Sequence, residues 1–255
     1  MHEMINRDRW VTIILAAGKG TRMKSPMAKV LHRLADRILL SYPIALARDM
    51  GCERIVVVVG HQADRIRQAV DDGEIGFVDQ TQQLGTGHAI CQTADTLTDF
   101  DGNILILCGD VPLLRLETIR AMTHLHINEK AAITVLTALL DDPAGYGRIV
   151  KDDSNNVIKI VEERDATDRE KEIREINTGI YCVRAGFLFE AVQLIDNDNA
   201  QGEYYLTDIF GIARSQHAIV RSLVVEDPDE TMGINTVTDL EKANRIMAQR
   251  GHRFV

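Results

Sequence analysis

Three cations stand close to a pair of glycines near the start of the chain. Gly18 and Gly20 follow an apolar run, and Lys19, Arg22 and Lys29 lie between or after them. Glycine lets a ligand approach the backbone closely, whereas arginine binds phosphate oxygens as a planar fork and lysine binds them as a mobile point charge. This combination predicts a phosphate-binding loop. The alternative is a glycine turn between a strand and an ordinary surface helix.

The spacing of these glycines excludes two familiar phosphate-binding loops. A Walker A loop requires G-x-x-x-x-G-K-[ST], and no arrangement of Gly18 and Gly20 supplies it. A dinucleotide-binding fingerprint requires G-x-G-x-x-G, and Met23 stands where its third glycine belongs. What remains, LAAGKGTRM followed by Lys29, resembles the signature of the sugar-1-phosphate nucleotidyltransferases.

A carboxylate stands at the end of a second apolar run. Asp110 follows residues 103–108 and lies between Gly109 and Pro112. A carboxylate at the carboxyl end of a buried strand can bind a hard cation, and Mg²⁺ typically takes one or two protein oxygens together with substrate phosphates. Alone, Asp110 would be interpreted as a turn-capping residue. Because a phosphate-binding loop is predicted in the same sheet, Asp110 predicts a magnesium site.

A polar loop, QTQQLGTGHA, offers groups that suit a nucleobase. Gln80 and Gln83 each present an amide donor and an amide acceptor, which fits a pyrimidine edge. Gly85 lets the backbone come near a base and ribose, and Thr86 adds a hydroxyl group. In isolation such a loop is a weak signal, since most polar glycine-rich loops bind nothing.

Composition excludes several classes of function. The 255 residues carry a net charge of −9 and contain no block of basic residues, so neither nucleic acid nor an acidic membrane is an expected partner. The four cysteines form no C-x-x-C pair, which disfavours a zinc site or a disulfide framework. No apolar run approaches the ~18 residues that a membrane span requires, and the N-terminus lacks an apolar signal core. We expect a soluble cytoplasmic protein.

Apolar runs alternate with helical stretches over the first half of the chain. This alternation predicts an α/β fold with a Rossmann-like, doubly wound, mostly parallel sheet, which binds ligands at the carboxyl ends of its strands. The expected strands are residues 11–15, 54–59, 75–78, 103–108 and 131–140. The expected helices are residues 41–50, 63–70, 88–96 and 115–128.

The pattern changes after about residue 140, where the predicted elements become short. Strands are expected at residues 148–150, 157–161, 173–183 and 218–225, and helices at residues 186–194 and 204–215. Thr238 and Glu241 match a capping box that would open a final helix. A single domain over residues 1–255 is the economical interpretation. It would comprise a nucleotide-binding half (about 1–140), a smaller sugar-side half (about 141–235) and a C-terminal helix and tail (236–255).

A set of motifs in one order makes the resemblance specific. From Val11 to Asn235 the chain contains LAAGKGTRM, QLGTGHA, GDVPL, GYGRI, IVEERDAT, INTGIY and NAQGEYYLTDI. Each motif alone is modest, but together they resemble the uridyltransferase domains of the bacterial N-acetylglucosamine-1-phosphate uridyltransferases. The resemblance implies a fold of the nucleotide-diphospho-sugar transferase type.

The same resemblance implies roles for the matching residues. The implied nucleotide-binding residues are Leu15, Ala16, Ala17, Gly18, Gly20, Thr21, Gln80, Gln83, Gly85, Thr86, Cys108 and Gly109. The implied catalytic residues are Arg22, Lys29 and Asp110, and the implied Mg²⁺ ligands are Asp110 and Asn235. The implied lining of an amino-sugar pocket is Gly147, Glu162, Asn177, Tyr205 and Thr207.

The chain departs from the family pattern in two places. Cys108 stands where the family often has a tyrosine. The family proteins usually continue into a left-handed β-helix acetyltransferase built from hexapeptide repeats, and no such repeats follow Asn235. We therefore expect uridyl transfer without acetyl transfer.

The resulting hypothesis is an enzyme that joins UTP and N-acetylglucosamine 1-phosphate into UDP-N-acetylglucosamine and pyrophosphate by Mg²⁺-assisted in-line displacement. Its partners would be these small molecules. One alternative is thymidylyl or guanylyl transfer, or transfer to another sugar phosphate, which QLGTGHA and the Glu162/Asn177 pair disfavour. Another is a nucleotide-sugar-binding protein without catalysis, which the presence of Lys29, Asp110 and Asn235 disfavours, since binding alone would not require a metal pair.

Overall fold

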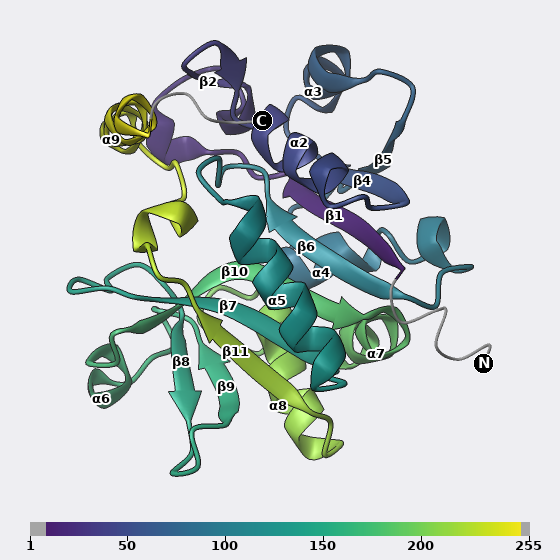
Figure 1. Cartoon of the computed structure of the whole chain (residues 1–255), viewed down its shortest axis with the longest axis vertical. Coiled ribbons are helices and arrows are strands. Elements are labelled where there is room, and N and C mark those ends of the chain that lie inside the picture. The colour runs from purple at the N-terminus through teal and green to yellow at the C-terminus, as the bar shows by residue number, and fades with distance from the viewer. Residues whose placement is uncertain (1–8, 251–255) are drawn as a thin grey trace.

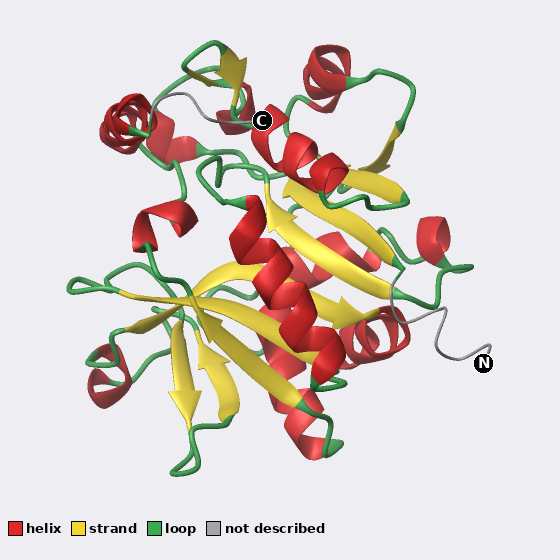
Figure 2. Ribbon diagram, viewed as in Figure 1, coloured by secondary structure: helices red, strands yellow, loops and turns green. Residues whose placement is uncertain are grey.

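A mixed sheet of nine strands runs through the structure, a computed structural model that describes residues 9–250 (Figures 1 and 2). Seven strands lie in the order β11-β7-β10-β6-β1-β4-β5, with β1 between β6 and β4. These strands are β1 (Trp10–Ala16), β4 (Arg54–Val59), β5 (Ile75–Asp79), β6 (Asn103–Cys108), β7 (Ile133–Leu139), β10 (Glu175–Arg184) and β11 (Val220–Val224). The predicted strand over each of these apolar runs is confirmed.

Most neighbouring strands in this order are parallel, as predicted. β1 is parallel to both β4 and β6, β4 is parallel to β5, and β11 is parallel to β7. β10 is the exception, because it runs antiparallel to β6 and to β7. The reversal brings the amino-terminal part of β10 to the edge of the sheet where β6 and β1 end. A hydrophobic run does not encode strand direction, so the sequence could not predict this reversal.

Helices cover both faces of the sheet, which confirms the doubly wound prediction. Alternate residues of β1 face opposite layers: Val11 and Ile13 pack in one apolar cluster, and Ile14 and Ala16 pack in the other. The first cluster includes residues of α4 (Thr86–Cys91), α7 (Ala185–Ala191) and α8 (Ile209–Ser215). The second includes residues of α2 (Ser41–Asp49), α3 (Ala63–Val70) and α5 (Leu116–Asn128).

Two smaller substructures extend from this sheet (Figure 1). The antiparallel pair β8 (Arg148–Lys151) and β9 (Val157–Val161) joins the sheet where Arg148 pairs with Ile176 of β10, and α6 (Asp168–Lys171) follows it. The pair β2 (Arg33–Leu34) and β3 (Arg37–Ile38) packs with α9 (Val237–Gln249) in a third apolar cluster. The β2–β3 pair was not predicted.

Three predicted helices differ from the observed ones. The helix predicted over residues 204–215 begins only at Ile209 as α8, after a 3-10 turn over Leu206–Asp208. The predicted capping box at Thr238 and Glu241 is wrong, because Thr236 accepts from the Asp239 amide at 3.1 Å and Asp239 accepts from the Thr236 amide at 2.8 Å. Asp239, at the third helical position, accepts from the Thr236 amide as a glutamate would in a capping box. The helix therefore begins two residues before the predicted start. The helix predicted to end at residue 96 ends at Cys91. Over residues 9–250, no helix combines the length and apolar character needed to cross a membrane.

Candidate functional site

Residues from distant segments meet at the edge of the sheet where β1 and β6 end. Lys29 donates from its ammonium group to the Asp110 carboxylate and to Asn235 Oδ1, the latter at 2.9 Å. Arg22 donates to the same Asn235 oxygen at 2.9 Å. The side chains of Lys29 and Asp110 are 17% and 18% exposed, so the pair is largely desolvated but still reaches solvent. We call Arg22, Lys29, Asp110 and Asn235 the Lys29 cluster.

The loop after β1 has a shape that admits Lys29. Gly20 has a φ of +61°, and a Cβ atom at this position would lie 2.5 Å from Lys29 Cβ. Any other residue would therefore strain the backbone and push Lys29 away. Gly18 and Thr21 of the same loop are exposed, whereas Ala16 and Ala17 are buried. The exposed backbone of this loop thus borders the Lys29 cluster.

The neighbouring strand end aligns Asp110 with this loop. Leu15 of β1 pairs with Cys108 of β6 in parallel register, and the Gly109 amide donates to the Leu15 carbonyl at 2.9 Å. Asp110 then follows at the same edge. The structure therefore brings together the loop and the carboxylate that the sequence predicts to be neighbours.

Asn235 is held by contacts on both sides. The Ile234 amide donates to the Asp110 carbonyl at 2.9 Å, and the Asn235 amide donates to the Asp239 carboxylate at 2.9 Å. Asn235 Nδ2 donates to the Gly233 carbonyl at 3.3 Å, which turns Oδ1 toward Lys29. Sequence reasoning missed the part that Asp239 plays, although its spacing from Thr236 is the signal that could have revealed it.

The Lys29 cluster supplies a small set of oxygen donors. One carboxylate oxygen of Asp110 and one amide oxygen of Asn235 converge on the Lys29 ammonium group. Such a set suits a Mg²⁺ ion that takes its remaining ligands from phosphates and water, provided that Lys29 turns toward the phosphates. Within residues 9–250, no three histidine, cysteine, aspartate or glutamate side chains gather as an all-protein metal site. The residues present thus fit a cation that is shared with a phosphorylated ligand.

The polar loop over residues 80–89 is attached to the second half of the chain. Gly85 has a φ of +112°, and a Cβ atom there would lie 2.5 Å from the Tyr204 carbonyl oxygen. The Tyr204 amide donates to the Leu84 carbonyl at 2.8 Å, and the Thr86 hydroxyl accepts from the Leu206 amide at 3.1 Å. The Thr86 side chain therefore anchors the two segments to each other.

The two predicted glutamines use their amide nitrogens within the loop. Gln80 is 4% exposed and donates to the Gly85 carbonyl at 2.9 Å, beside His88 Nδ1 at 3.1 Å. Gln83 donates to the Gln80 carbonyl at 2.9 Å. Among the described residues, neither glutamine amide oxygen accepts a hydrogen bond. These oxygens are the groups that remain for a base.

Four of the five residues predicted for a sugar pocket converge. The Thr207 hydroxyl donates to Glu162 at 3.0 Å, and the Asn177 amide donates to the Gly147 carbonyl at 2.8 Å. A Cβ atom on Gly147 would lie 3.5 Å from a Glu162 oxygen and 3.4 Å from Asn177 Cβ. We call Gly147, Glu162, Asn177 and Thr207 the Glu162 cluster. The hydroxyl of the fifth residue, Tyr205, instead donates to Asp165 at 3.3 Å.

Burial perturbs the acids in and around the Glu162 cluster. Burial raises the pKa of Glu162, the Thr207 hydroxyl opposes the rise, and the nearby carboxylates of Asp208, Asp165 and Glu203 add to it. Burial also raises the pKa of Asp208 to about 6, with Asp196 and Asp165 contributing. Glu162 has no ion pair with a described residue. Its carboxylate is therefore an acceptor for hydroxyl or amide donors, and a poor partner for an anion.

A tyrosine that sequence reasoning missed supports this cluster from β10. The Tyr181 hydroxyl donates to Asn177 Oδ1 at 2.9 Å, and the Gly179 amide donates to the same oxygen at 3.1 Å. These bonds occupy the Asn177 oxygen and leave its Nδ2 group as the donor for a ligand. Tyr181 lies within an apolar strand, and nothing in the sequence distinguishes it from a core residue.

The two clusters lie close to each other along the sheet edge. The Cys108 thiol lies 3.5 Å from the carbonyl of Gly179, and burial raises the pKa of this thiol to about 12. Tyr146, beside Gly147, has its pKa raised by burial and also by the carboxylates of Asp239 and Asp110. Cys108 is two residues from Asp110 and Gly179 is two residues from Asn177, so the thiol contact joins the strands that carry the two clusters. A ligand with a phosphate end and a polar end can contact both clusters.

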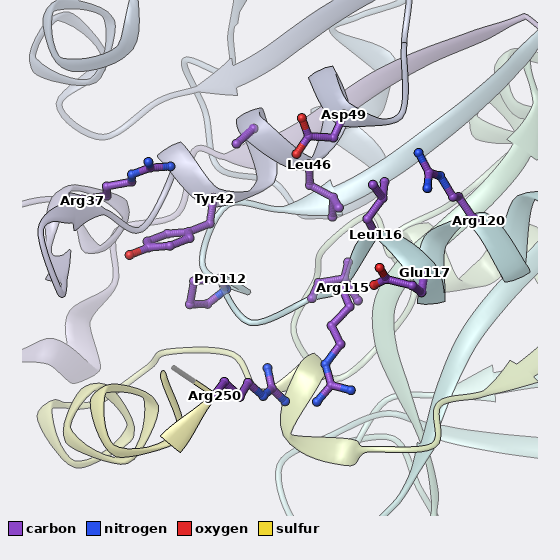
Figure 3. A pocket seen from close by; sticks show the side chains of 12 residues that line it. Arg37, Tyr42, Leu46, Asp49, Pro112, Arg115, Leu116, Glu117, Arg120 and Arg250 are labelled. Carbon is purple, nitrogen blue, oxygen red and sulfur yellow. The ribbon is translucent and has the colours of Figure 1, made fainter. Parts of the chain in front are cut away.

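A cavity of about 520 Å³ lies elsewhere, between α2, the start of α5 and the end of α9 (Figure 3). Its lining includes Tyr42, Leu46 and Leu116, together with arginines such as Arg115 and Arg250. None of the predicted site residues lines this cavity. The chemistry of the Lys29 and Glu162 clusters therefore belongs to a different part of the molecule.

Residues 12–157, more than half of the chain, match the family model of the MobA-like NTP transferase domain. Curated relatives named "Bifunctional protein GlmU" match at high identity. The protein from Geobacter metallireducens is 52% identical over 242 residues, which are 94% of this chain and 51% of that protein. The protein from Limosilactobacillus fermentum is 44% identical over 247 residues, which are 97% of this chain and 53% of that protein. The chain spans about half the length of these relatives.

Proposed function

Because the chain belongs to the family of MobA-like NTP transferase domains, we propose that it transfers UMP from UTP to N-acetylglucosamine 1-phosphate. The products are UDP-N-acetylglucosamine and pyrophosphate. The observation that carries the proposal is the Lys29 cluster, in which two cations and two oxygen ligands meet beside an exposed glycine loop. The match to the GlmU proteins over nearly the whole chain supports it.

In the proposed reaction, an oxygen of the sugar phosphate attacks the α-phosphorus of UTP. A new phosphorus–oxygen bond forms, the bond from the α-phosphorus to the bridging oxygen of the β-phosphate breaks, and pyrophosphate leaves with the electron pair. The nucleophile is already an anion, so no side chain has to remove a proton. Catalysis then consists of positioning the reactants and neutralising charge.

Lys29 and Arg22 are the cations that would neutralise this charge. The ammonium group of Lys29 is held by Asp110 and Asn235, and a triphosphate competes with these two residues for it. Once Lys29 turns to the phosphates, Asp110 and Asn235 are the residues that would hold Mg²⁺. The ion, when bound, supplies charge neutralisation and orientation of the phosphates.

The Gln80 and Gln83 amide oxygens support the choice of a uracil base. Uracil presents an N–H donor between two carbonyl acceptors, and an amide oxygen accepts from that donor. Backbone amides of the polar loop can serve the uracil carbonyls. Thymine presents the same edge, so these residues alone do not separate uridyl from thymidylyl transfer.

The Glu162 cluster supports an amino-sugar acceptor. Glu162 would accept from sugar hydroxyl groups and from the N–H of a 2-acetamido group, and Asn177 Nδ2 can donate to the carbonyl of that group. An acceptor that lacks this group leaves buried polar atoms without partners, at a cost of about 1–3 kcal/mol each. The cluster therefore favours N-acetylglucosamine 1-phosphate over glucose 1-phosphate.

Pyrophosphate release by the purified chain tests the proposal. UTP, dTTP, GTP and CTP are each offered with N-acetylglucosamine 1-phosphate, glucose 1-phosphate and mannose 1-phosphate, in the presence of Mg²⁺. The proposal predicts the fastest turnover with UTP and N-acetylglucosamine 1-phosphate. Faster turnover with another pair identifies a different nucleotidyl transfer, and no turnover with any pair favours a binding protein.

A further inference from the structure

The two segments that carry Asp110 and Asn235 run side by side in opposite directions. We name residues 110–115 the Asp110 segment and residues 230–235 the Asn235 segment. At one end the Ile234 amide donates to the Asp110 carbonyl at 2.9 Å. Five residues along, at the other end, the Arg115 amide donates to Glu230 Oε2 at 3.2 Å. The segments are therefore joined at both ends.

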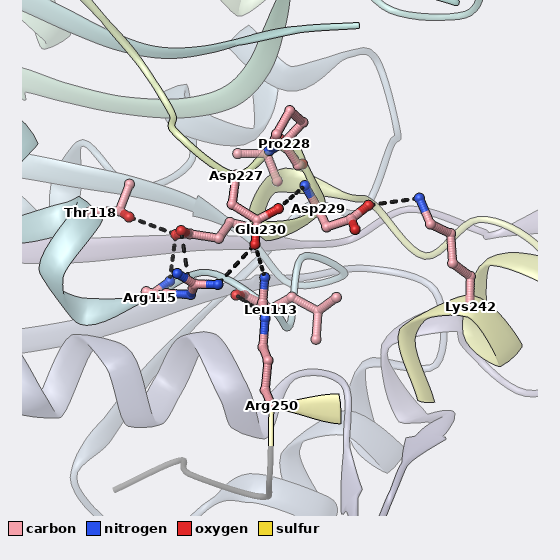
Figure 4. A network of polar contacts seen from close by, with 10 residues as sticks. Leu113, Arg115, Thr118, Asp227, Pro228, Asp229, Glu230, Lys242 and Arg250 are labelled. Atoms are coloured by element: carbon pink, nitrogen blue, oxygen red, sulfur yellow. Dashed lines mark hydrogen bonds and ion pairs between the residues drawn. The ribbon is translucent and has the colours of Figure 1, made fainter. Parts of the chain in front are cut away.

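Glu230 makes the second of these joints, and it is buried. Glu230 is 2% exposed, and its Oε2 atom also accepts a hydrogen bond from the Thr118 hydroxyl at 2.6 Å (Figure 4). The Arg115 Nε atom lies 3.5 Å from the other carboxylate oxygen. Arg115 itself forms no side-chain cap at the start of α5, so Glu230 caps this helix from a distant segment.

The neighbouring acids of the same turn make contacts of a different kind. Asp227 accepts from Arg115 at 2.8 Å and from Arg250 at 2.7 Å, but its side chain is 37% exposed. Asp229 pairs with Lys242 at 2.7 Å, where both side chains are at least 39% exposed. Exposed ion pairs contribute little. Glu230 is the buried acid of this turn, and its carboxylate binds the Arg115 amide and the Thr118 hydroxyl directly.

We propose that Glu230 is a positioning residue for the proposed nucleotidyl transfer, acting through Asn235. This inference rests on the proposed function. By fixing the Asn235 segment to the start of α5, Glu230 holds the Asn235 amide oxygen on the Lys29 ammonium group that Asp110 also contacts. A shift of about 1 Å in a group that orients phosphates can lower a rate by about 100-fold. The side-chain contacts of Glu230 are with Arg115 and Thr118 of the α5 start.

A double-mutant cycle separates positioning from a general structural role. Glu230→Gln, assayed where the variant is fully folded, should lower kcat/KM for UTP about 10-fold. Asn235→Ala should lower it about 100-fold, and adding Glu230→Gln to Asn235→Ala should lower it less than twofold further, because the group being positioned is gone. Equal losses in both backgrounds overturn the proposal.

Asp229→Asn is the matched control, since it removes a carboxylate from the same turn without touching the Asp110 segment. We expect its kcat/KM within twofold of wild type. If Glu230→Gln does not fold, Thr118→Val decides, because it removes one donor to Glu230 at nearly constant volume. Thr118→Val should lower kcat/KM about threefold in the wild-type background but not in the Asn235→Ala background. A loss of the same size in both backgrounds contradicts the proposal.

Hydrogen exchange provides a test that does not depend on activity. Glu230→Gln should speed exchange of the Ile234 amide, which donates to Asp110, by at least about 10-fold. The Gly109 amide, which donates to Leu15, should keep its rate. If the wild-type chain transfers no UMP, the proposed function fails. The exchange rate still shows whether Glu230 stabilises the hydrogen bond between Ile234 and Asp110. An unchanged Ile234 rate overturns the inference even in an active enzyme.

Discussion

The Lys29 cluster and the Glu162 cluster lie along one edge of the sheet but differ in charge balance. In the first, Asp110 is paired with Lys29, and Asn235 accepts from both Lys29 and Arg22. In the second, Glu162 is held by the Thr207 hydroxyl, and burial raises its pKa. The first cluster can exchange its internal partners for an anionic ligand. The second repels anions and offers hydrogen bonds to neutral groups.

Under the proposed function, this difference gives each cluster a separate task. Charge develops and moves at phosphorus, so the cations belong where phosphates bind, and their removal should lower the rate with every acceptor. Hydroxyl and amide groups distinguish one sugar from another, so neutral hydrogen bonding belongs where the sugar binds. Damage to the Lys29 cluster should reduce turnover, and damage to the Glu162 cluster should reduce selectivity.

The largest expected effect is that of Lys29→Ala. The change removes the ammonium group that we propose binds the phosphates, and it should lower kcat by at least about 100-fold, comparable to the loss of one preorganised electrostatic group. Steady-state pyrophosphate release measures it. The exposed Lys171→Ala is the control and should retain wild-type kcat. Wild-type turnover in Lys29→Ala would show that the cluster does not serve the phosphates.

A smaller effect is expected for Glu162→Gln, which keeps the shape of the side chain. Loss of the charged acceptor should raise KM for N-acetylglucosamine 1-phosphate about 10-fold, because hydrogen bonds to a charged group contribute about 1.5–3 kcal/mol. KM for UTP should stay within twofold. The exposed Glu172→Gln serves as the control. An equal rise in both KM values would mean that Glu162 does not discriminate between the two substrates.

The smallest expected effect concerns stability at Asp208. Its pKa is about 6 in the folded state against an ordinary value of 3.8, so the folded state binds a proton first as pH falls. Above pH 6 the ionised Asp208 destabilises the fold, and this penalty disappears between pH 6 and about 4. Asp208→Asn should therefore raise the free energy of unfolding by about 1 kcal/mol at pH 7.5, less than the full shift implies because the group is partly exposed.

Urea unfolding at pH 7.5, 6.0 and 4.5 measures this effect, with the exposed Asp153→Asn as control. The gain from Asp208→Asn should shrink toward zero at pH 4.5. A gain in unfolding free energy that is the same at all three pH values, or a loss at pH 7.5, would contradict the claim that burial and nearby carboxylates destabilise the ionised Asp208.

The sequence predicts most strands of the fold because buried strands are nearly continuous apolar runs. The run at β1 and the run at β6 are examples, and each is followed by the glycines and polar residues that form one edge. The reversed direction of β10 has no counterpart in the pattern of residues. It depends on which neighbours the strand finds, and it brings Asn177 to the same edge as Asp110.

The candidate site could be predicted where its residues occur in short motifs. Lys29 and Asp110 stand in such motifs, and the structure brings them together. Tyr181 and Glu230 do not, because each acts through a partner far away in the sequence: Tyr181 supports Asn177, and Glu230 caps α5 across 115 residues. The sequence around Tyr181 does not differ from that around an ordinary strand tyrosine, and the sequence around Glu230 does not differ from that around an ordinary surface glutamate.

The ratio of kcat/KM for N-acetylglucosamine 1-phosphate to kcat/KM for glucose 1-phosphate tests the division of tasks most directly. It is measured with UTP in the wild-type chain, in Asp110→Asn and in Glu162→Ala. We expect a ratio of at least about 100 in the wild type. Asp110→Asn should slow both acceptors by at least about 100-fold and leave the ratio unchanged within twofold, whereas Glu162→Ala should reduce the ratio about 10-fold. A ratio that falls in Asp110→Asn as much as in Glu162→Ala would contradict the account.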